Sequence, residues 1–298
     1  MDKLEGILLL NRIQEILIDS ELTKDIKIPE IVVIGSQSSG KSSLLDILIG
    51  TPFLPKGEGI VTKSPIVIQS INNESLSDYK LSVVQGNHQS NYSDFNELSL
   101  NITNITKKIL GKNNGVSNKP ILVKMEGPGL PTLSCVDLPG ITRIAVEGQP
   151  SDIEEKTRNL ALQFISNPKS VIIAISSANV DIANSESIKL AKEVDPDLNR
   201  TLCIVTKLDL FNESLESLHN ILNNKYVHCK HGFVGISNKY KEAQNNISVP
   251  PNSFGRDQIL FRINKILKEI IRKDLPDLKE SLKIQLKVKL LETRTKKR

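Results

Sequence analysis

The stretch that decides the fold is IPEIVVIGSQSSGKSSLLDILIG, at residues 28–50. Its first part, Ile31–Ile34, is a β-branched apolar run typical of a buried strand, and Lys41–Ile49 has the pattern of a helix. The junction, Gly35–Ser42, fits G-x-x-x-x-G-K-[ST]. A glycine loop between a strand and a helix N-terminus turns its amides toward phosphate groups. The stretch therefore predicts an α/β fold with a phosphate-binding loop (P-loop).

The P-loop also predicts which side chains meet a nucleotide. In this pattern the lysine reaches the β- and γ-phosphates and the next hydroxyl binds Mg²⁺, so these roles are assigned to Lys41 and Ser42. The nucleotide-binding residues expected from the loop and the start of the helix are Ser36, Gln37, Ser38, Ser39, Gly40, Lys41, Ser42 and Ser43.

A second motif, DLPG at Asp137–Gly140, follows the apolar run LSCV. The carboxyl ends of parallel strands meet at one edge of a sheet, so Asp137 is expected beside the P-loop, where its carboxylate holds Mg²⁺, usually through water. The Gly140 amide is expected to sense the γ-phosphate. A lone D-x-x-G tetrapeptide is usually a turn, and it becomes informative here because a P-loop precedes it.

A third motif, TKLD at Thr206–Asp209, ends the apolar run LCIV. A carboxylate at Asp209 would accept hydrogen bonds from N1–H and the exocyclic amine of guanine, whereas adenine has an acceptor at N1 and would be repelled. The stem of Lys207 can lie along the base. The alternative is a helix-capping aspartate. Taken in this order, the three motifs predict a Mg²⁺-dependent GTPase rather than a general nucleotide-binding protein.

The residue that orients the attacking water is less obvious. Ile141 follows Gly140 at the position where Ras-like enzymes use a glutamine, so another group must do this work. Gln37 is the nearest amide with the reach, and Ser38 beside it offers a hydroxyl. Gln37 could instead be a loop residue that faces solvent. Thr62, in KGEGIVTKSP, is the expected switch residue that closes over Mg²⁺ and the water.

The rest of the chain alternates strands with helices. This alternation predicts a doubly wound, mainly parallel central sheet flanked by helices. The further strands expected are Ile66–Ile68, Leu81–Val84, Ile121–Lys124, Leu133–Val136, Val171–Ile175, Leu202–Val205 and Phe233–Ile236. The further helices expected are Asp152–Ser166, Ser185–Val194 and Ser214–Asn223. Residues 72–118 are rich in Asn and Ser, so we expect a surface insertion of loops with one helix near Asp94–Leu110.

Two amphipathic patterns flank this core. Ile7–Ile18 and the apolar residues between Ile259 and Ile271 each repeat at a helical period, so the two helices are expected to pack together as a bundle. The resulting domain division is an N-terminal bundle helix at 1–28, a nucleotide-binding domain at 29–250 and a C-terminal helix with a basic end at 257–298.

Composition excludes several classes of protein. With 39% hydrophobic and 24% charged residues among 298, the chain is neither a disordered nor a membrane-spanning protein. The formal charge of +5 comes from residues 283–298, which carry +6 by themselves, and there is no Trp for base stacking. We therefore expect no nucleic-acid partner, although contact between the basic end and an acidic surface stays open as an alternative. The odd set Cys135, Cys203 and Cys229 indicates a reducing compartment, hence the cytoplasm.

At this point the chain resembles the dynamin superfamily of large GTPases over nearly its whole length. The similarity is carried by the P-loop stretch at 28–50 and by stretches that follow in the family's order. These are FLPKGEGIVTKSPIVIQ, LSCVDLPGIT, SSANVDIANSESIKLAKEVDP, RTLCIVTKLDL and GFVGISNK.

The resemblance implies roles that the residues alone did not give. Gln37 matches the glutamine that orients the catalytic water, and Ser38 matches a serine that binds a monovalent cation, Na⁺ or K⁺. Gly57 and Gly59 match glycines whose carbonyls complete that cation site. Asp181, in ANVDIANS, matches an aspartate that acts across a head-to-head homodimer of GTPase domains. The implied catalytic set is Gln37, Ser38, Lys41, Thr62, Gly140 and Asp181, and the last guanine contacts are Asn238 and Lys239.

The resemblance also sets expectations about biological output. It implies GTP-driven membrane remodelling such as vesicle scission or organelle division, with GTP and GDP as ligands and a location in the cytoplasm or at the periphery of membranes. The chain ends at about the point where the family's stalk begins, so we expect membrane association to be indirect or to need regions beyond it. Two alternatives remain open, an Mx-type restriction protein and a GTP-gated binding module with little turnover.

Overall fold

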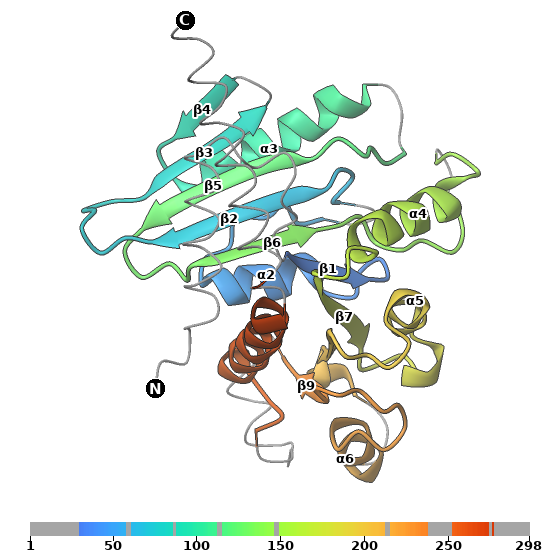
Figure 1. Ribbon diagram of the computed structural model, residues 1–298. Helices are drawn as coiled ribbons and strands as arrows, with labels where there is room; N and C mark the ends of the chain where they lie inside the picture. Colours follow the sequence, from blue (N-terminus) through green and yellow to red (C-terminus); the bar gives the residue numbers. More distant parts are fainter. Residues whose placement is uncertain are drawn as a thin grey trace, which may run out of the picture.

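The computed structural model describes residues 30–57, 61–85, 88–111, 115–145, 149–211, 215–237, 252–273 and 276. Within them, one sheet has the strand order β4-β3-β5-β2-β6-β1-β7-β8-β9 (Figure 1). The strands are β1 Ile31–Gly35, β2 Ile66–Asn72, β3 Lys80–Gln85, β4 His88–Tyr92, β5 Ile121–Gly127, β6 Leu133–Asp137, β7 Val171–Ser177, β8 Thr201–Thr206 and β9 Phe233–Gly235.

Most neighbouring strands are parallel, which confirms the predicted fold class. Strands β6, β1, β7, β8 and β9 run parallel to one another, and β2 is parallel to β5. Strand β2 is antiparallel to β6, and β3 is antiparallel to both β5 and β4. Because β6, β1, β7 and β8 share one direction, their carboxyl ends lie along one edge of the sheet.

Helices cover the sheet on both faces. The helices are α2 Lys41–Ile49, α3 Phe95–Leu110, α4 Ile153–Ile165, α5 Glu186–Val194, α6 Leu215–Leu222 and a helix at residues 256–273 (dark red in Figure 1). Helices α2, α3 and 256–273 share one hydrophobic cluster, whereas α4, α5 and α6 share the other. The predicted helix at residues 7–18 lies outside the described residues, so the bundle and the domain boundaries stay predictions.

The central strands bury both of their faces. In β1, Ile31 and Val33 belong to the cluster under α2, while Val32 and Ile34 belong to the cluster under α4 and α5. Such a strand has no solvent-facing side and therefore reads as a continuous apolar run. Strand β5 differs, because its residues alternate between buried and half-buried along the whole strand. It packs on only one side, against the cluster that includes α3.

The polar insertion is more regular than expected. Within residues 72–118, β3 and α3 match the predicted strand Leu81–Val84 and the predicted helix near Asp94–Leu110, whereas β4 forms where loops were expected; both strands extend the sheet. Strand β4 was not predicted, because its residues HQSNY are mostly exposed and show no apolar alternation. Polar side chains build the start of α3: Asp94 accepts hydrogen bonds from the Asn96 and Glu97 amides at 2.8 Å each. The polar residues of this segment therefore form an edge strand and a helix cap rather than loops.

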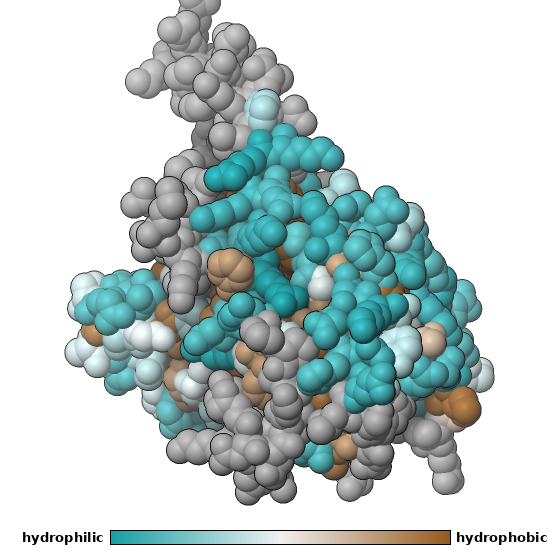
Figure 2. Space-filling model, turned by 90° about the horizontal axis from the view of Figure 1, so that it is seen from below, coloured by the Kyte–Doolittle hydropathy of each residue, from teal (hydrophilic) through white to brown (hydrophobic). Residues whose placement is uncertain are grey.

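The surface supplies little apolar area on the face shown in Figure 2, where hydrophilic residues predominate and apolar ones are scattered. Among the residues that the structure describes, no helix has both the length and the apolar content needed to cross a bilayer.

Candidate nucleotide-binding site

The P-loop is a tight backbone turn between β1 and α2. Gly40 has φ 93° and Ser38 has φ 60°, both in the left-handed region that non-glycine residues seldom adopt. Gly35 has no room for a side chain, because a Cβ there would lie 2.5 Å from Ser39 Oγ and 3.1 Å from the Ile175 carbonyl oxygen. The loop is thus pressed against β7, and this close approach fixes the direction of its amides.

Lys41 spans the P-loop from inside. Its Nζ donates to the carbonyl oxygens of Gly35 at 3.2 Å and Ser36 at 3.0 Å, and the side chain is buried. Burial lowers the pKa of Lys41 to about 8, and the nearby Asp137 carboxylate opposes this shift. The present acceptors of the Lys41 ammonium are neutral carbonyl groups. Its hydrogen bonds can therefore move to the charged oxygens of a bound phosphate, which are stronger acceptors.

Three predicted Mg²⁺ residues meet at one carboxylate. Ser42 Oγ donates to Asp137 Oδ2 at 2.9 Å, and Thr62 Oγ1 donates to the same oxygen at 3.0 Å. Asp137 Oδ1 is buried and accepts no hydrogen bond from any residue that the structure describes. Burial raises the pKa of Asp137, although Lys41 and the two hydroxyls act against the shift. Hard oxygen donors and a buried carboxylate oxygen with free lone pairs fit Mg²⁺.

The DLPG loop is fastened to the P-loop by backbone contacts. Gln37 N donates to the Ile141 carbonyl at 3.2 Å, and Ile141 N donates to the Gly35 carbonyl at 3.0 Å. At Gly140 a Cβ would lie 2.7 Å from Gln37 Cα and 3.2 Å from Lys41 Nζ. Only a glycine fits where the two loops press together, so the requirement for glycine at this position has a steric cause.

A cavity of about 280 Å³ opens between these loops. It is called the phosphate cavity below, because most of the predicted phosphate-binding residues line it. Five of the six predicted catalytic residues line it, together with most of the predicted phosphate-binding residues and a glycine of the predicted cation site. The lining residues are Gln37, Ser38, Gly40, Lys41, Ser42, Ser43, Pro55, Lys56, Gly57, Val61, Thr62, Gly140 and Lys207. Gly59 lies outside the described residues.

Asp181 lies apart from this cavity. It follows β7 at the same edge of the sheet, is exposed, and caps the short 3₁₀ helix η1 (Ile182–Asn184) by accepting the Ala183 amide at 3.0 Å. Its neighbour Val180 is 50% exposed. The structure therefore places Asp181 on the surface beside the site and not within it.

The guanine motif is tied to the P-loop by its first residue. Thr206 Oγ1 donates to the Ser39 carbonyl at 2.6 Å, so this side chain positions the loop. Lys207 adopts a left-handed conformation, with φ 57°, and lines the phosphate cavity. Asp209 lies in the 3₁₀ helix η2 (Leu208–Leu210) and accepts a hydrogen bond from Ser237 Oγ at 2.8 Å. The predicted contacts Asn238 and Lys239 lie outside the described residues.

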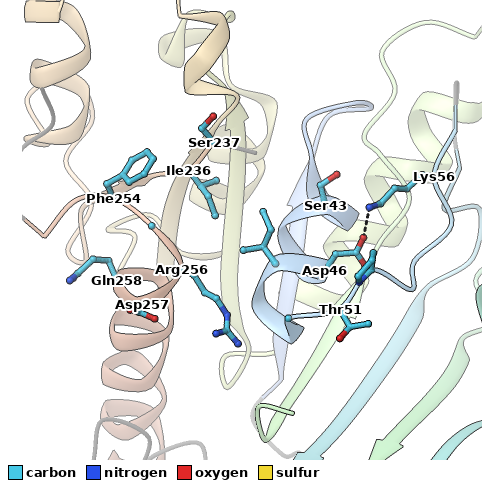
Figure 3. A pocket seen from close by; sticks show the side chains of 14 residues that line it. Ser43, Asp46, Thr51, Lys56, Ile236, Ser237, Phe254, Arg256, Asp257 and Gln258 are labelled. Atoms are coloured by element: carbon cyan, nitrogen blue, oxygen red, sulfur yellow. Dashed lines mark ion pairs between the residues drawn. The ribbon is translucent and has the colours of Figure 1, made fainter. Parts of the chain in front are cut away.

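Sequence reasoning missed a second set of residues near the site. Asp46, on α2, accepts the Phe53 and Leu54 amides at 3.1 and 3.2 Å and forms an ion pair of 2.8 Å with Lys56 (Figure 3). These contacts fix the segment that leads to Gly57. The only signal in the sequence was a single acidic residue in an apolar helix.

A groove of about 810 Å³ continues from the phosphate cavity along α2, and Ser43 and Lys56 line both spaces (Figure 3). Its far wall is the start of the helix at residues 256–273. There Arg256 donates to the Leu48 carbonyl oxygen at 2.8 Å through Nη2 and at 3.3 Å through Nε, so the C-terminal helix holds the end of α2.

A parallel sheet edge that brings together a P-loop, a D-x-x-G loop and a T-K-x-D motif defines a P-loop GTPase, a hydrolase of GTP. The profile of the dynamin family matches residues 31–208, more than half of the chain, and the chain belongs to this family. GTP and GDP are the ligands of this class, and Mg²⁺ is its usual cofactor.

Known relatives agree with this assignment. The chain is 38% identical over 291 residues to Dynamin-1-like protein of Mus musculus, covering 87% of this chain and 39% of that protein. It is 35% identical over 330 residues to Dynamin-related protein DNM1 of Saccharomyces cerevisiae, covering 91% of this chain and 43% of that protein. The chain thus spans less than half the length of these relatives.

Proposed function

We propose that this domain hydrolyses GTP by in-line attack of water and that pairing of two GTPase domains stimulates the reaction. The observation that carries the proposal is the shared cavity, which is lined by Gln37, Ser38, Lys41, Thr62 and Gly140. These residues come from the P-loop, the switch segment and the DLPG loop, so a single bound triphosphate would contact all three.

The phosphate end of the reaction rests on Lys41. Its ammonium lies between the Gly35 and Ser36 carbonyls, and a β,γ-phosphate would supply charged acceptors in their place. Mg²⁺, when bound through Ser42, Thr62 and Asp137, would neutralise charge on the phosphates. Lys41 then stabilises the charge that develops on the transferred group, and the buried site strengthens this interaction.

The water-directing role is assigned to Gln37. Its backbone is fixed by the hydrogen bond to Ile141, and it lines the cavity in which a γ-phosphate would lie, which supports this assignment. Beside it, Ser38 and the carbonyls of Gly57 and Gly59 would bind Na⁺ or K⁺ in place of an arginine finger. Ser38 and Gly57 lie in the same cavity wall, which supports this assignment.

Dimer stimulation is assigned to the surface around Asp181. This exposed carboxylate follows β7 at the sheet edge that carries the nucleotide site, so a second copy approaching that edge could use it. The cellular output proposed is membrane remodelling such as vesicle scission or organelle division, with membrane contact made indirectly and the protein at the periphery of membranes. An Mx-like restriction role and a GTP-gated recruitment role are the competing outputs.

The test is phosphate release from GTP across a series of protein concentrations, in K⁺ or Na⁺ and in a large organic cation. Turnover per molecule should rise with concentration and collapse without K⁺ or Na⁺. Asp181→Ala should remove the concentration dependence, whereas Asp78→Ala, an exposed acid far along the sheet, should keep it. A rate that is flat with concentration and indifferent to the cation would instead favour a GTP-gated binding module.

A further inference from the structure

Two thiols outside the nucleotide site lie unusually close together. Cys203 Sγ, on β8, is 3.0 Å from Cys229 Sγ, in the loop that precedes β9. Both cysteines are fully buried in the cluster under α4, α5 and α6. An S–S bond is about 2.05 Å long, so the two sulfurs need to approach by only about 1 Å to be linked.

Hydrogen bonds hold the backbone of both cysteines in this position. The Asn224 side chain accepts the Cys229 amide at 2.9 Å and donates to the Cys229 carbonyl at 2.9 Å. Gly232 N donates to the same carbonyl at 2.9 Å. Cys203 lies within the ladder, paired with Ala174 on β7 and with Phe233 on β9. The close approach is therefore built into the fold rather than left to flexible side chains.

We propose that Cys203 and Cys229 form an oxidation site, which a peroxide converts to an intramolecular disulfide. The inference is independent of the GTPase mechanism, because neither cysteine lines the nucleotide cavity. The disulfide would join β8, whose end carries the guanine motif, to the loop that leads into β9 and Ser237.

The position of Cys229 indicates the order of the chemistry. Its neighbours His228 and Lys230 are exposed, so a local opening of this loop would bring Cys229 to solvent, whereas Cys203 lies inside the sheet. The hydrogen bond with Cys229, together with burial, raises the pKa of the Cys203 thiol, which keeps it protonated in the closed fold. Cys229 is thus the residue that meets the oxidant first.

The proposed disulfide forms in two steps. The Cys229 thiol first loses its proton to solvent. Its thiolate then attacks one oxygen of hydrogen peroxide, the O–O bond breaks, and the products are Cys229 sulfenic acid and hydroxide, which takes up a proton from solvent to become water. After the loop closes, Cys203 sulfur attacks the sulfenic sulfur, an S–S bond forms, the S–O bond breaks, and water leaves with the thiol proton. Two thiols are oxidised and one peroxide is reduced to two waters.

The test uses the whole chain, treated with hydrogen peroxide under folding conditions and then denatured for thiol titration and peptide mapping. Free thiols should fall from three to one, with a 203–229 linkage that a reductant reverses. Cys135 is the internal control, since it is equally buried but lies in the other cluster. Retention of all three thiols, or loss of Cys135 in place of the pair, would overturn the proposal. This result needs no variant, so it does not depend on how a substitution folds.

Single substitutions test the order of attack. Cys203→Ser should trap Cys229 as the sulfenic acid, which a cyclic dione reagent captures and mass spectrometry detects. Cys229→Ser should give no capture at Cys203. Equal capture in the two variants would contradict the role assigned to opening of the loop around Cys229.

Discussion

The two halves of the sheet follow different rules. Strands β1, β7 and β8 are covered by helices on both faces, and all of their residues are buried. Strands β2 and β5 are covered on one face, and their residues alternate between buried and partly exposed. The half with β1, β7 and β8, which is covered on both faces, carries the P-loop and the guanine motif at its strand ends. The one-sided half supplies length and a polar edge.

This difference explains where the chain tolerates polar composition. A strand with two buried faces leaves no position for a polar side chain to meet water, so β7 and β8 are apolar through their middle and carry Ser or Thr only at their ends. The one-sided half can carry polar residues on its open face. The predicted chemistry therefore lies in the half that is buried on both faces, and four predictions test this division.

The largest effect is expected from Lys41→Ala, at the end of a doubly covered strand. Removing the ammonium from the phosphate cavity should slow GTP turnover by at least about 100-fold, on the scale of losing one transition-state donor. Lys80→Ala, at the exposed first residue of β3, is the matched control and should leave turnover unchanged. Steady-state phosphate release measures both variants, and equal rates would remove Lys41 from the proposed mechanism.

The next effect concerns stability. Leu202→Ala, on β8, deletes a fully buried side chain and should lower the free energy of unfolding by about 2–5 kcal/mol. Leu122→Ala makes the same change on the half-buried face of β5 and should cost about 1 kcal/mol or less, because less surface is uncovered. Denaturant unfolding of both variants gives the comparison. Similar losses would show that the open face of β5 is packed as tightly as β8.

A smaller effect is expected at the contact between the loops. Gly140→Ala would place a Cβ 2.7 Å from Gln37 Cα, so the DLPG loop must shift and turnover should fall by about 10- to 100-fold. Gly129→Ala is the control, since this glycine lies in the turn after β5, outside the cavity, and its Cβ would meet nothing within 4 Å. Kinetics of the two variants, with circular dichroism to verify folding, decides whether the close approach matters.

The smallest effect is a dependence on pH. Lys41 has a pKa of about 8 in the fold, against an ordinary value of 10.5, so between these pH values the unfolded chain holds more protons. The destabilisation caused by burying Lys41 is complete below pH 8 and fades as the pH rises toward 10.5. Nucleotide affinity should change in the opposite direction and weaken above pH 8. Lys41→Met should flatten both profiles, and unchanged profiles would contradict the proton assignment.

Much of the fold and of the nucleotide site could be predicted from the sequence, because the patterns that define them involve residues close together in the chain. Continuous apolar runs predicted β1, β7 and β8, and the P-loop, DLPG and TKLD motifs predicted a GTPase. Strand β4 could not be predicted from the sequence, since an exposed edge strand has no apolar pattern. The role of Asp46 could not be predicted either. Its carboxylate accepts the Phe53 and Leu54 amides only because the chain after α2 folds back against this helix.

The sequence by itself determined the class of fold, the family resemblance and the residue types of the nucleotide site, since periodicity and motif spacing are properties of neighbouring residues. Only the tertiary structure decided that Ser42 and Thr62 converge on Asp137, that Gly140 is pressed against Gln37, and that two cysteines 26 residues apart face each other. These contacts join distant segments through the shared edge and the shared core of the sheet. Their distances follow from packing in three dimensions, which a linear pattern does not contain.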